Sequence, residues 1–266
     1  MTTAREEVER HMALTEGIRW SWEEIYDGLA LDQLVPPPPV AWTPDLLARC
    51  DAVFAAHVAP ARGELVARAA LDGVPPWIFL EYAVKRRGLL AHGSNRADIA
   101  RFEPKAARDH YAGGEVAKVY AASSALPPIF YAILDRKRLW TLPAVPAMNM
   151  IHANWEEDGE PREGFWFVID HRALPHSPWQ EGTVYLLPRG PFVADHREMQ
   201  WYATTAVDPL VRIAVAAEDF PLLGEVRGID WFEDARRGTV GAPFRGDPLL
   251  YPAEGATTKK GAPTAR

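Results

Sequence analysis

Three short stretches of the sequence hold residue types that can bind a ligand or take part in catalysis. His92-Gly93-Ser94 ends an apolar run, and Tyr120 and Tyr131 stand eleven positions apart in VYAASSALPPIFY. Glu181 and Glu198 each open a segment that is typical of a strand, and the segment after Glu198 is rich in aromatic residues. Imidazole and hydroxyl groups form hydrogen bonds, aromatic rings stack on flat rings, and a carboxylate stabilises positive charge. Together these residues could hold a ring-bearing ligand beside a carboxylate.

The segments that carry these residues are typical of β-strands. After Gly88 the chain contains short runs of β-branched and aromatic residues separated by Gly, Pro or Asp, namely LLAHGS, AKVYAAS, MNMIHANW, GFWFVID, TVYLLP, EMQWYAT and VRIAVAA. The Asp158-Gly159 pair indicates a hairpin, and PPIFYAILDRKRLW predicts one helix inserted between the second and third strands. The sequence therefore predicts an α+β domain of mainly antiparallel strands, with helices in front of the sheet.

The first 87 residues predict helices. Apolar residues recur at spacings of three or four between Val8 and Leu29, Thr43-Pro44 has the pattern of a helix start, and residues 75–88 end on three cations and a glycine. We also expect a helix between Pro60 and Gly73. The run VPPPPV at 35–40 has fixed φ angles and prolines without amide donors, so it predicts a stiff extended connector.

These patterns suggest three parts: an N-terminal helical region at 1–87, a domain with the predicted strands at 88–235, and a C-terminal extension at 236–266 that we expect to be partly disordered. The chain has 266 residues, which is enough for a substantial core. The first residues lack the apolar stretch of a secretory signal, and no run approaches the ~18 residues of a membrane span. We therefore expect a soluble, cytoplasmic protein with no membrane partner.

Several classes of site are disfavoured by composition. Cys50 is the single cysteine, so neither an intramolecular disulfide nor a cysteine metal cluster can form, and we expect no metal site. A net charge of −7 disfavours nonspecific attraction to nucleic acid. The motifs of dinucleotide oxidoreductases, P-loop enzymes, elbow-type hydrolases and common zinc peptidases do not occur.

The order and spacing of the first two stretches resemble the diphtheria-toxin and poly(ADP-ribose) polymerase class of ADP-ribosyltransferases. In that class H-G-[ST] closes a first strand, Y-x10-Y follows from a second strand, and a glutamate lies on a later strand; His92-Gly93-Ser94 and the Tyr120/Tyr131 pair match the first two elements. The resemblance covers about residues 88–220. It implies an ADP-ribosyltransferase-like split antiparallel β-sheet core, preceded here by a helical region that it does not explain.

The resemblance also implies roles for these residues, with NAD as the substrate. His92 would hydrogen-bond the adenosine ribose, and Ser94 would add a hydroxyl group. The Gly93 backbone, lacking a Cβ, would let the nicotinamide amide approach. Tyr120 and Tyr131 would enclose the nicotinamide ring between them.

Two glutamates are candidates for the catalytic carboxylate. Glu198 opens EMQWYAT and is followed, after a connector, by the predicted last strand, as the family pattern implies. Glu181 opens EGTVYLL, which is similar to the E-x-x-V-Y string of some polymerase members, but another pair of strands follows it. We favour Glu198, with Glu181 as the alternative. The carboxylate would support the oxocarbenium-like ribose that forms when the nicotinamide–ribose bond breaks.

The function implied is transfer of one ADP-ribose from NAD to an acceptor that the sequence leaves open: a protein, a nucleic acid or a small molecule. A toxin-like role is an expectation by analogy only, and the N-terminal helices are candidates for binding a partner. Two alternatives stay open. One is a noncatalytic binding module of the same fold, and the other is an enzyme similar to RNA 2′-phosphotransferases, in which Arg96, Arg101 and Arg189 would contact RNA phosphate.

Overall fold

A seven-stranded sheet forms the centre of the computed structural model, which describes residues 31–105, 117–136, 148–171, 173–194 and 200–229. The strand order is β1-β9-β6-β2-β3-β8-β7, and a second sheet has the order β10-β5-β4. The strands are β1 (Leu65–Val66), β2 (Leu90–Ser94), β3 (Val119–Ala122), β4 (Met148–Glu157), β5 (Glu160–Asp170), β6 (Gly182–Leu187), β7 (Val193–Ala194), β8 (Gln200–Ala203), β9 (Val211–Val215) and β10 (Arg227–Ile229). All neighbours pair antiparallel except β1 with β9 and β10 with β5.

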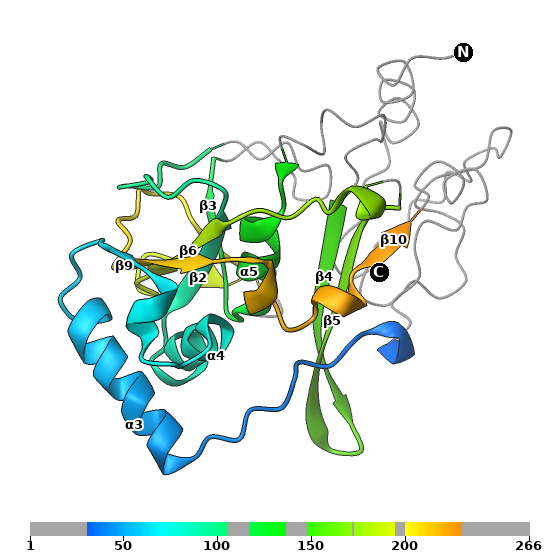
Figure 1. Ribbon diagram of the computed structural model, residues 1–266, viewed down its shortest axis with the longest axis horizontal. Helices are drawn as coiled ribbons and strands as arrows, with labels where there is room; N and C mark the ends of the chain where they lie inside the picture. Colours follow the sequence, from blue (N-terminus) through cyan, green and yellow to red (C-terminus); the bar gives the residue numbers. More distant parts are fainter. Residues whose placement is uncertain (1–30, 106–116, 137–147, 172, 195–199, 230–266) are drawn as a thin grey trace, which may run out of the picture.

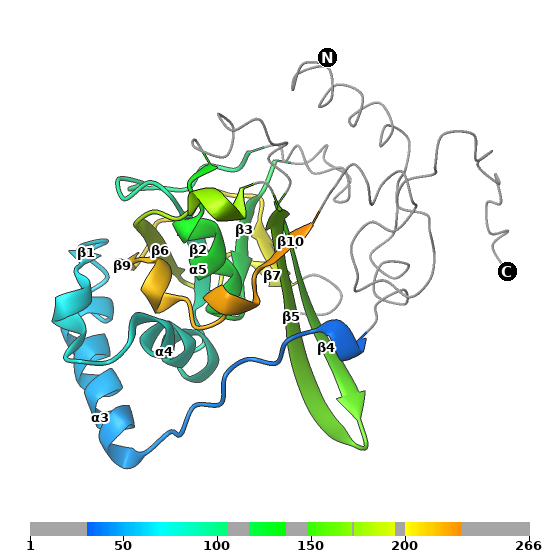
Figure 2. The ribbon, with the colours of Figure 1, turned by 45° about the vertical axis from the view of Figure 1, so that its right-hand side comes forward.

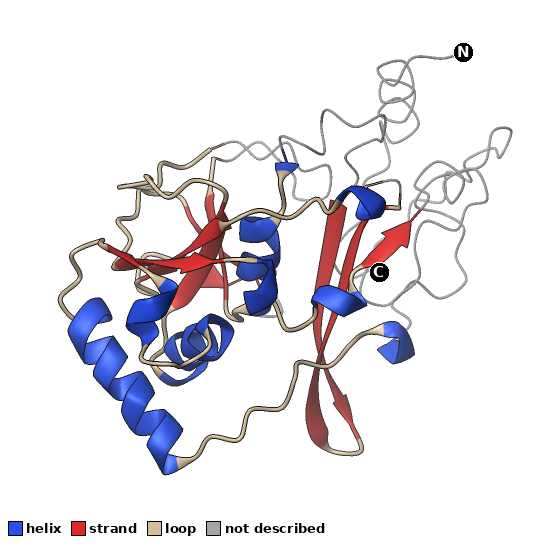
Figure 3. Cartoon of the chain, in the orientation of Figure 1, coloured by secondary structure: helices blue, strands red, loops and turns tan. Residues whose placement is uncertain are grey.

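The helices are short and lie beside these sheets (Figure 3). They are α3 (Pro44–Val53), α4 (Pro76–Glu81) and α5 (Leu126–Ile133); α3 and α4 continue into the π-helical turns η2 (Phe54–Val58) and η4 (Tyr82–Arg86). The short 3-10 turns are η1 (Leu31–Gln33), η3 (Arg68–Leu71), η5 (Leu174–His176), η6 (Ala217–Asp219) and η7 (Leu223–Glu225). Within the described residues, none of the helices has the length and apolar content needed to cross a membrane.

Helix α5 lies between the two sheets, as Figures 1 and 2 show. The ring centroid of Phe130 on α5 lies 4.9 Å from that of Phe167 on β5, and Ile129 and Ile133 of the same helix are fully buried. A helix this apolar is stable only when most of its surface is buried, and both sheets contribute to that cover. Residues of α3, α4, α5 and both sheets thus share one hydrophobic core.

Two glycines let α5 approach the central sheet closely. A Cβ at Gly93 of β2 would lie 1.8 Å from the carbonyl oxygen of Pro128, and one at Gly182 of β6 would lie 2.1 Å from the carbonyl oxygen of Ala132. Real Cβ atoms do not come so near to backbone oxygen, so only glycine fits at either position. The neighbouring strands β2 and β6 therefore both contact α5 through a glycine, which has no side chain to keep the helix away.

All seven predicted strands are present, and the α+β class is confirmed. Two of them, β4 and β5, form the hairpin of the second sheet, whereas the other five belong to the seven-stranded sheet. Asp158 and Gly159 turn this hairpin with φ angles of 54° and 79°, as expected of an Asp-Gly turn. Thr43 also caps α3 as predicted, because its Oγ1 accepts a hydrogen bond from Leu46 N.

The prediction of a helix between Pro60 and Gly73 is wrong. This segment forms the short strand β1 and the turn η3, and β1 pairs in parallel with β9. The backbone of Gly63 bonds Leu210, and Arg212 Nε donates to the Gly63 carbonyl at 2.7 Å. These bonds hold the chain against the edge of β9 and override the helical pattern.

The inserted helix is shorter than the sequence predicted. It ends at Ile133 because Leu134 forms a bridge with Trp179. The Asn95 amide, directly after β2, donates to the carbonyls of Ala132 (2.6 Å) and Leu134 (2.7 Å). Asn95 thus holds the end of α5 against the end of β2.

Several expectations fall outside the described residues, including the helix before Leu29 and the extension at 236–266. The division at residue 87/88 stays a prediction, although residues on both sides of it share the large core.

Candidate functional site

The structure places the H-G-S residues and the first tyrosine on neighbouring strands. His92, Gly93 and Ser94 are the last three residues of β2, and Tyr120 lies in the middle of β3. Tyr131 lies on α5, which packs against both strands. The sequence match therefore corresponds to one region of the fold.

Strands β2 and β3 separate at this region. Their pairing is limited to Ala91↔Ala122, whereas β2 pairs with β6 along its whole length from Leu90 to Ser94. Beyond Ala91 the link to β3 is made by a side chain, because His92 Nδ1 lies 2.7 Å from the carbonyl oxygen of Tyr120. The two motif residues meet where the ladder opens.

This contact defines the chemistry of the imidazole. A carbonyl oxygen only accepts hydrogen bonds, so Nδ1 carries the proton and donates. In the neutral ring Nε2 then has a lone pair and can accept a hydrogen bond, for example from a hydroxyl group. Burial lowers the pKa of His92, while its bond to the Tyr120 carbonyl acts in the opposite direction, and the net shift is downward. The ring also packs 4.7 Å from Phe102.

We expect His92 to stay neutral, with the proton on Nδ1, at pH 6.5, where an exposed histidine is half protonated. Because the folded pKa lies below the unfolded one, the unfolded chain binds the proton more readily; the stability that depends on His92 is complete above pH 6.5 and declines below it. Nitrogen-15 chemical shifts of the imidazole ring, followed against pH, measure both its protonation state and which nitrogen carries the proton. A His92 ring that titrates like that of an exposed histidine would contradict this.

The side chains of the site point to the two faces of the sheet. His92 faces the smaller core cluster that contains Phe102, Val119 and Ala121. Tyr120 alternates with Val119 and Ala121, so it faces the α5 side, which the Cβ direction of Gly93 shares. The two tyrosines are therefore on one side of the sheet and the imidazole is on the other.

Gly93 has a packing role that the sequence did not reveal. The space on its Cβ side is filled by the Pro128 backbone of α5. The glycine is thus required by the helix whether or not its backbone meets a ligand, and its role toward nicotinamide stays a prediction.

Tyr131 is half-buried, whereas the other residues of α5 are buried. Its ring lies 5.5 Å from Phe130, and the guanidinium of Arg136 is 5.5 Å from the ring centroid. An arginine above a tyrosine ring is an attractive cation–π contact. One side of this ring is therefore occupied by a cation from the same chain.

The two candidate carboxylates have different surroundings. Glu181 is exposed and directly precedes β6, which borders β2 on the edge away from β3. Glu198 lies outside the described residues, and β8 begins two positions after it, at Gln200. Strand β8 borders β3, and its Tyr202 is directly opposite Tyr120.

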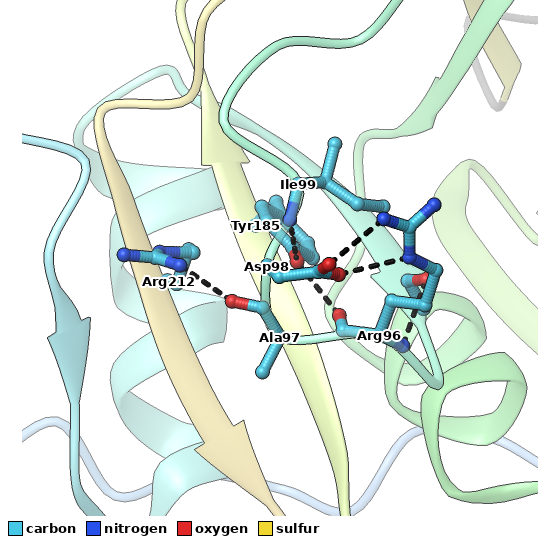
Figure 4. Close-up of polar contacts among 7 residues, drawn as sticks. Arg96, Ala97, Asp98, Ile99, Tyr185 and Arg212 are labelled. Carbon is cyan, nitrogen blue, oxygen red and sulfur yellow. Dashed lines mark hydrogen bonds and ion pairs between the residues drawn. The ribbon is translucent and has the colours of Figure 1, made fainter.

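A polar network fixes the loop that follows Ser94 (Figure 4). Ser94 Oγ accepts a hydrogen bond from Arg96 N at 3.2 Å. The Tyr185 hydroxyl donates to the Arg96 carbonyl (2.7 Å) and accepts from Ile99 N (3.1 Å), and Arg212 donates to the Ala97 carbonyl. Sequence reasoning missed Tyr185 and Arg212 because these residues read as ordinary strand positions.

The three arginines considered for RNA phosphate have partners within the chain. Arg96 binds Asp98 through two nitrogens, at 2.8 and 2.9 Å. Arg101 contacts carboxylates at 3.3 and 3.5 Å, and the Arg189 guanidinium lies 4.0 Å from the centroid of Trp201. Phosphate binding at these positions would have to compete with existing contacts.

A cavity of ≈ 470 Å³ lies elsewhere, between the proline connector and α4, and none of the predicted site residues lines it.

Comparison with family models, curated proteins and solved structures found no match to this chain.

Proposed function

We propose that the protein is an NAD-dependent mono-ADP-ribosyltransferase whose site lies where β2 and β3 separate. The observation that carries the proposal is the bond from His92 Nδ1 to the Tyr120 carbonyl. It joins the H-G-S element to the first tyrosine of Y-x10-Y. On the next strand, Tyr202 of β8 lies directly opposite Tyr120. The resemblance implies that these two elements lie side by side, and residues 28 positions apart have no local reason to meet. The contact is made by the Tyr120 carbonyl, while the Tyr120 ring lies on the other face of the sheet, so the proposed ligand would reach both rings where β2 and β3 separate.

The neutral imidazole suits the role proposed for it. Nε2 of His92 accepts a hydrogen bond, so it binds a ribose hydroxyl without adding positive charge to the site. This matters because the reacting ribose itself becomes cationic, and a nearby imidazolium would oppose that change.

In the proposed reaction the bond between nicotinamide nitrogen and ribose C1′ breaks, and nicotinamide leaves as a neutral molecule with the bonding electrons. A carboxylate supports the cationic ribose. The acceptor then forms a new bond to C1′ and releases a proton to a base. Glu198 is the proposed carboxylate, because β8 borders the strand of Tyr120, whereas exposed Glu181 lies before a strand on the far side of β2.

The test is nicotinamide release from NAD, followed by chromatography with and without cell lysate. We expect release by the intact protein, stimulation by lysate that contains an acceptor, and loss of at least about 100-fold in Glu198→Gln. Glu181→Gln is the matched control and should retain activity. Equal activity in both variants would overturn the assignment to Glu198, and loss in Glu181→Gln alone would move the role there.

The noncatalytic module is the second candidate, and it predicts neither NAD consumption nor stabilisation by NAD. A melting temperature that rises with NAD in the wild type, and less so in Tyr120→Ala, would contradict it. The RNA 2′-phosphotransferase alternative has less support because Arg96, Arg101 and Arg189 already bind groups of this chain.

A further inference from the structure

The cavity beside α4 has walls from three segments that are far apart in the sequence. The extended connector at residues 35–43 passes α4 on its way to α3, as Figures 1 and 2 show, and it forms one wall. The cavity is lined by residues that include Trp42, Trp77, Glu81, Lys85, Arg86 and Leu126. Its volume of ≈ 470 Å³ is within the range of small-molecule sites.

Two tryptophans give the cavity an aromatic lining. Trp42 and Trp77 are half-buried, so part of each indole contacts the core and part is accessible. The guanidinium of Arg86 lies 4.8 Å from the ring centroid of Trp42, which fixes a cation beside this ring. Indole rings at a cavity wall offer stacking surface to a flat ligand.

Glu81 supplies a hydrogen-bond acceptor. Its Oε2 accepts from Ala125 N at 2.9 Å, just before α5 begins, which fixes the direction of the carboxyl group. Burial raises the pKa of Glu81, and the Ala125 amide and Lys85 act in the opposite direction. A carboxylate has about four lone-pair positions, so a ligand N–H can bind beside the amide.

Two cationic side chains of the lining favour an anionic group. Lys85 and Arg86 are exposed and line the cavity, and Lys85 Nζ also binds Glu163 at 3.0 Å. A cationic ligand would meet both side chains, and Arg86 already lies against Trp42. The part of the lining near Arg86 therefore suits the negative end of a ligand, while Glu81 suits a hydrogen-bond donor elsewhere on it.

We propose that this cavity is a binding site for a small molecule that joins a flat nitrogen-containing ring to an anionic group, with a purine nucleoside monophosphate as the fitting class. The ring stacks on the tryptophans, a ring or amino N–H donates to Glu81, and the phosphate lies near Arg86. The site is separate from the one between β2 and β3, since none of His92, Gly93 and Tyr120 lines it.

The experiment is calorimetric titration of the full chain with AMP and with GMP, which present different N–H donors to Glu81. We expect at least one of them to bind. Adenosine or guanosine tests the need for phosphate, and inorganic phosphate tests the need for the base; each should bind at least about 10-fold more weakly than the nucleotide, because a charge-assisted bond or a stacked ring is lost.

Glu81→Gln is the main variant. Glutamine keeps an oxygen for the Ala125 amide but presents an NH₂ group to the cavity, so affinity should fall about 10-fold or more. Arg86→Ala should weaken binding by about 5-fold or more, whereas its neighbour Arg87→Ala, which removes the same charge outside the cavity lining, should not. Circular dichroism checks that each variant is folded.

Two outcomes would overturn the proposal. One is that neither nucleotide binds the wild-type chain. The other is binding that is unchanged in Glu81→Gln and Arg86→Ala but lost in His92→Ala, because the nucleotide would then occupy the site between β2 and β3. The proposal does not depend on NAD cleavage, so an inactive protein that binds AMP through Glu81 would still support it.

Discussion

Gly93→Ala should destabilise the protein by about 3 kcal/mol and lower its melting temperature by about 6–12 °C. The new Cβ would lie 1.8 Å from the Pro128 carbonyl oxygen and 2.7 Å from the carbonyl carbon. Backbone atoms cannot rotate away as a flexible side chain does, so α5 itself must move. Since α5 fills the space between two sheets, the movement disturbs packing on both sides. Thermal and urea unfolding measure the loss.

The matched control is Gly190→Ala. Gly190 has no atom within 4 Å of the position of an added Cβ and does not have a positive φ angle. Alanine there should change stability by no more than about 0.5 kcal/mol in the destabilising direction. Similar stabilities for the wild type and Gly93→Ala would show that the close approach of α5 to β2 is incorrect.

Glu163→Gln should cost about 2–3 kcal/mol at pH 7. Glu163 Oε1 binds His152 Nε2 at 2.7 Å and Lys85 Nζ at 3.0 Å, and the Glu163 side chain is 20% exposed. Burial alone would raise the pKa of this carboxyl, but the His152 and Lys85 contacts outweigh it and bring the pKa to about 2. Glutamine has the same shape without the charge, so the variant removes the electrostatic contribution and leaves Lys85 unpaired here.

The pH dependence follows from the direction of that shift. The folded pKa lies below the unfolded value, so folding favours the ionised form, and the stabilisation is complete above about pH 4.5. It is lost as the pH falls toward 2, and the difference between wild type and Glu163→Gln should shrink over that window. Urea unfolding at pH 7, 5, 4 and 3.5 tests this.

Glu160→Gln serves as the control, because Glu160 is exposed on the same strand. It should leave stability at pH 7 within about 0.5 kcal/mol of the wild type. A difference for Glu163→Gln that stays constant down to pH 3.5 would contradict the ionic origin of the effect.

The sequence predicted the strands well because each is a short run with clear turn residues at its ends. It failed at residues 65–66, where the backbone pairs with β9, since nothing in the local pattern of Leu65 and Val66 identifies a partner so far along the chain. The length of α5 was overestimated for the same reason. Its end depends on Asn95, which directly follows β2 and is far from α5 in the sequence.

At the candidate site, the sequence placed His92 and Gly93 on one strand and Tyr120 on the next, and the structure shows that these strands are neighbours in the sheet. It could not predict that the strands separate beyond Ala91, because separation results from how β2 and β3 are held by their other neighbours. It also could not tell that the missing side chain of Gly93 makes room for α5. The choice of Glu198 stays a prediction.

Strand β9 has a consequence for how the protein forms during synthesis. It lies between β6 (Gly182–Leu187) and β1 (Leu65–Val66) and pairs with both. Both of these strands are synthesised before β9, and β1 is synthesised long before it. Until Val211–Val215 has left the ribosome, β1 lacks the strand with which it pairs among the described residues, and the edge of β6 that β9 covers is open. An exposed apolar edge of this kind invites pairing with other chains. The nascent chain should therefore be prone to wrong pairing until Val211–Val215 emerges, and a chain that stops before residue 211 should aggregate.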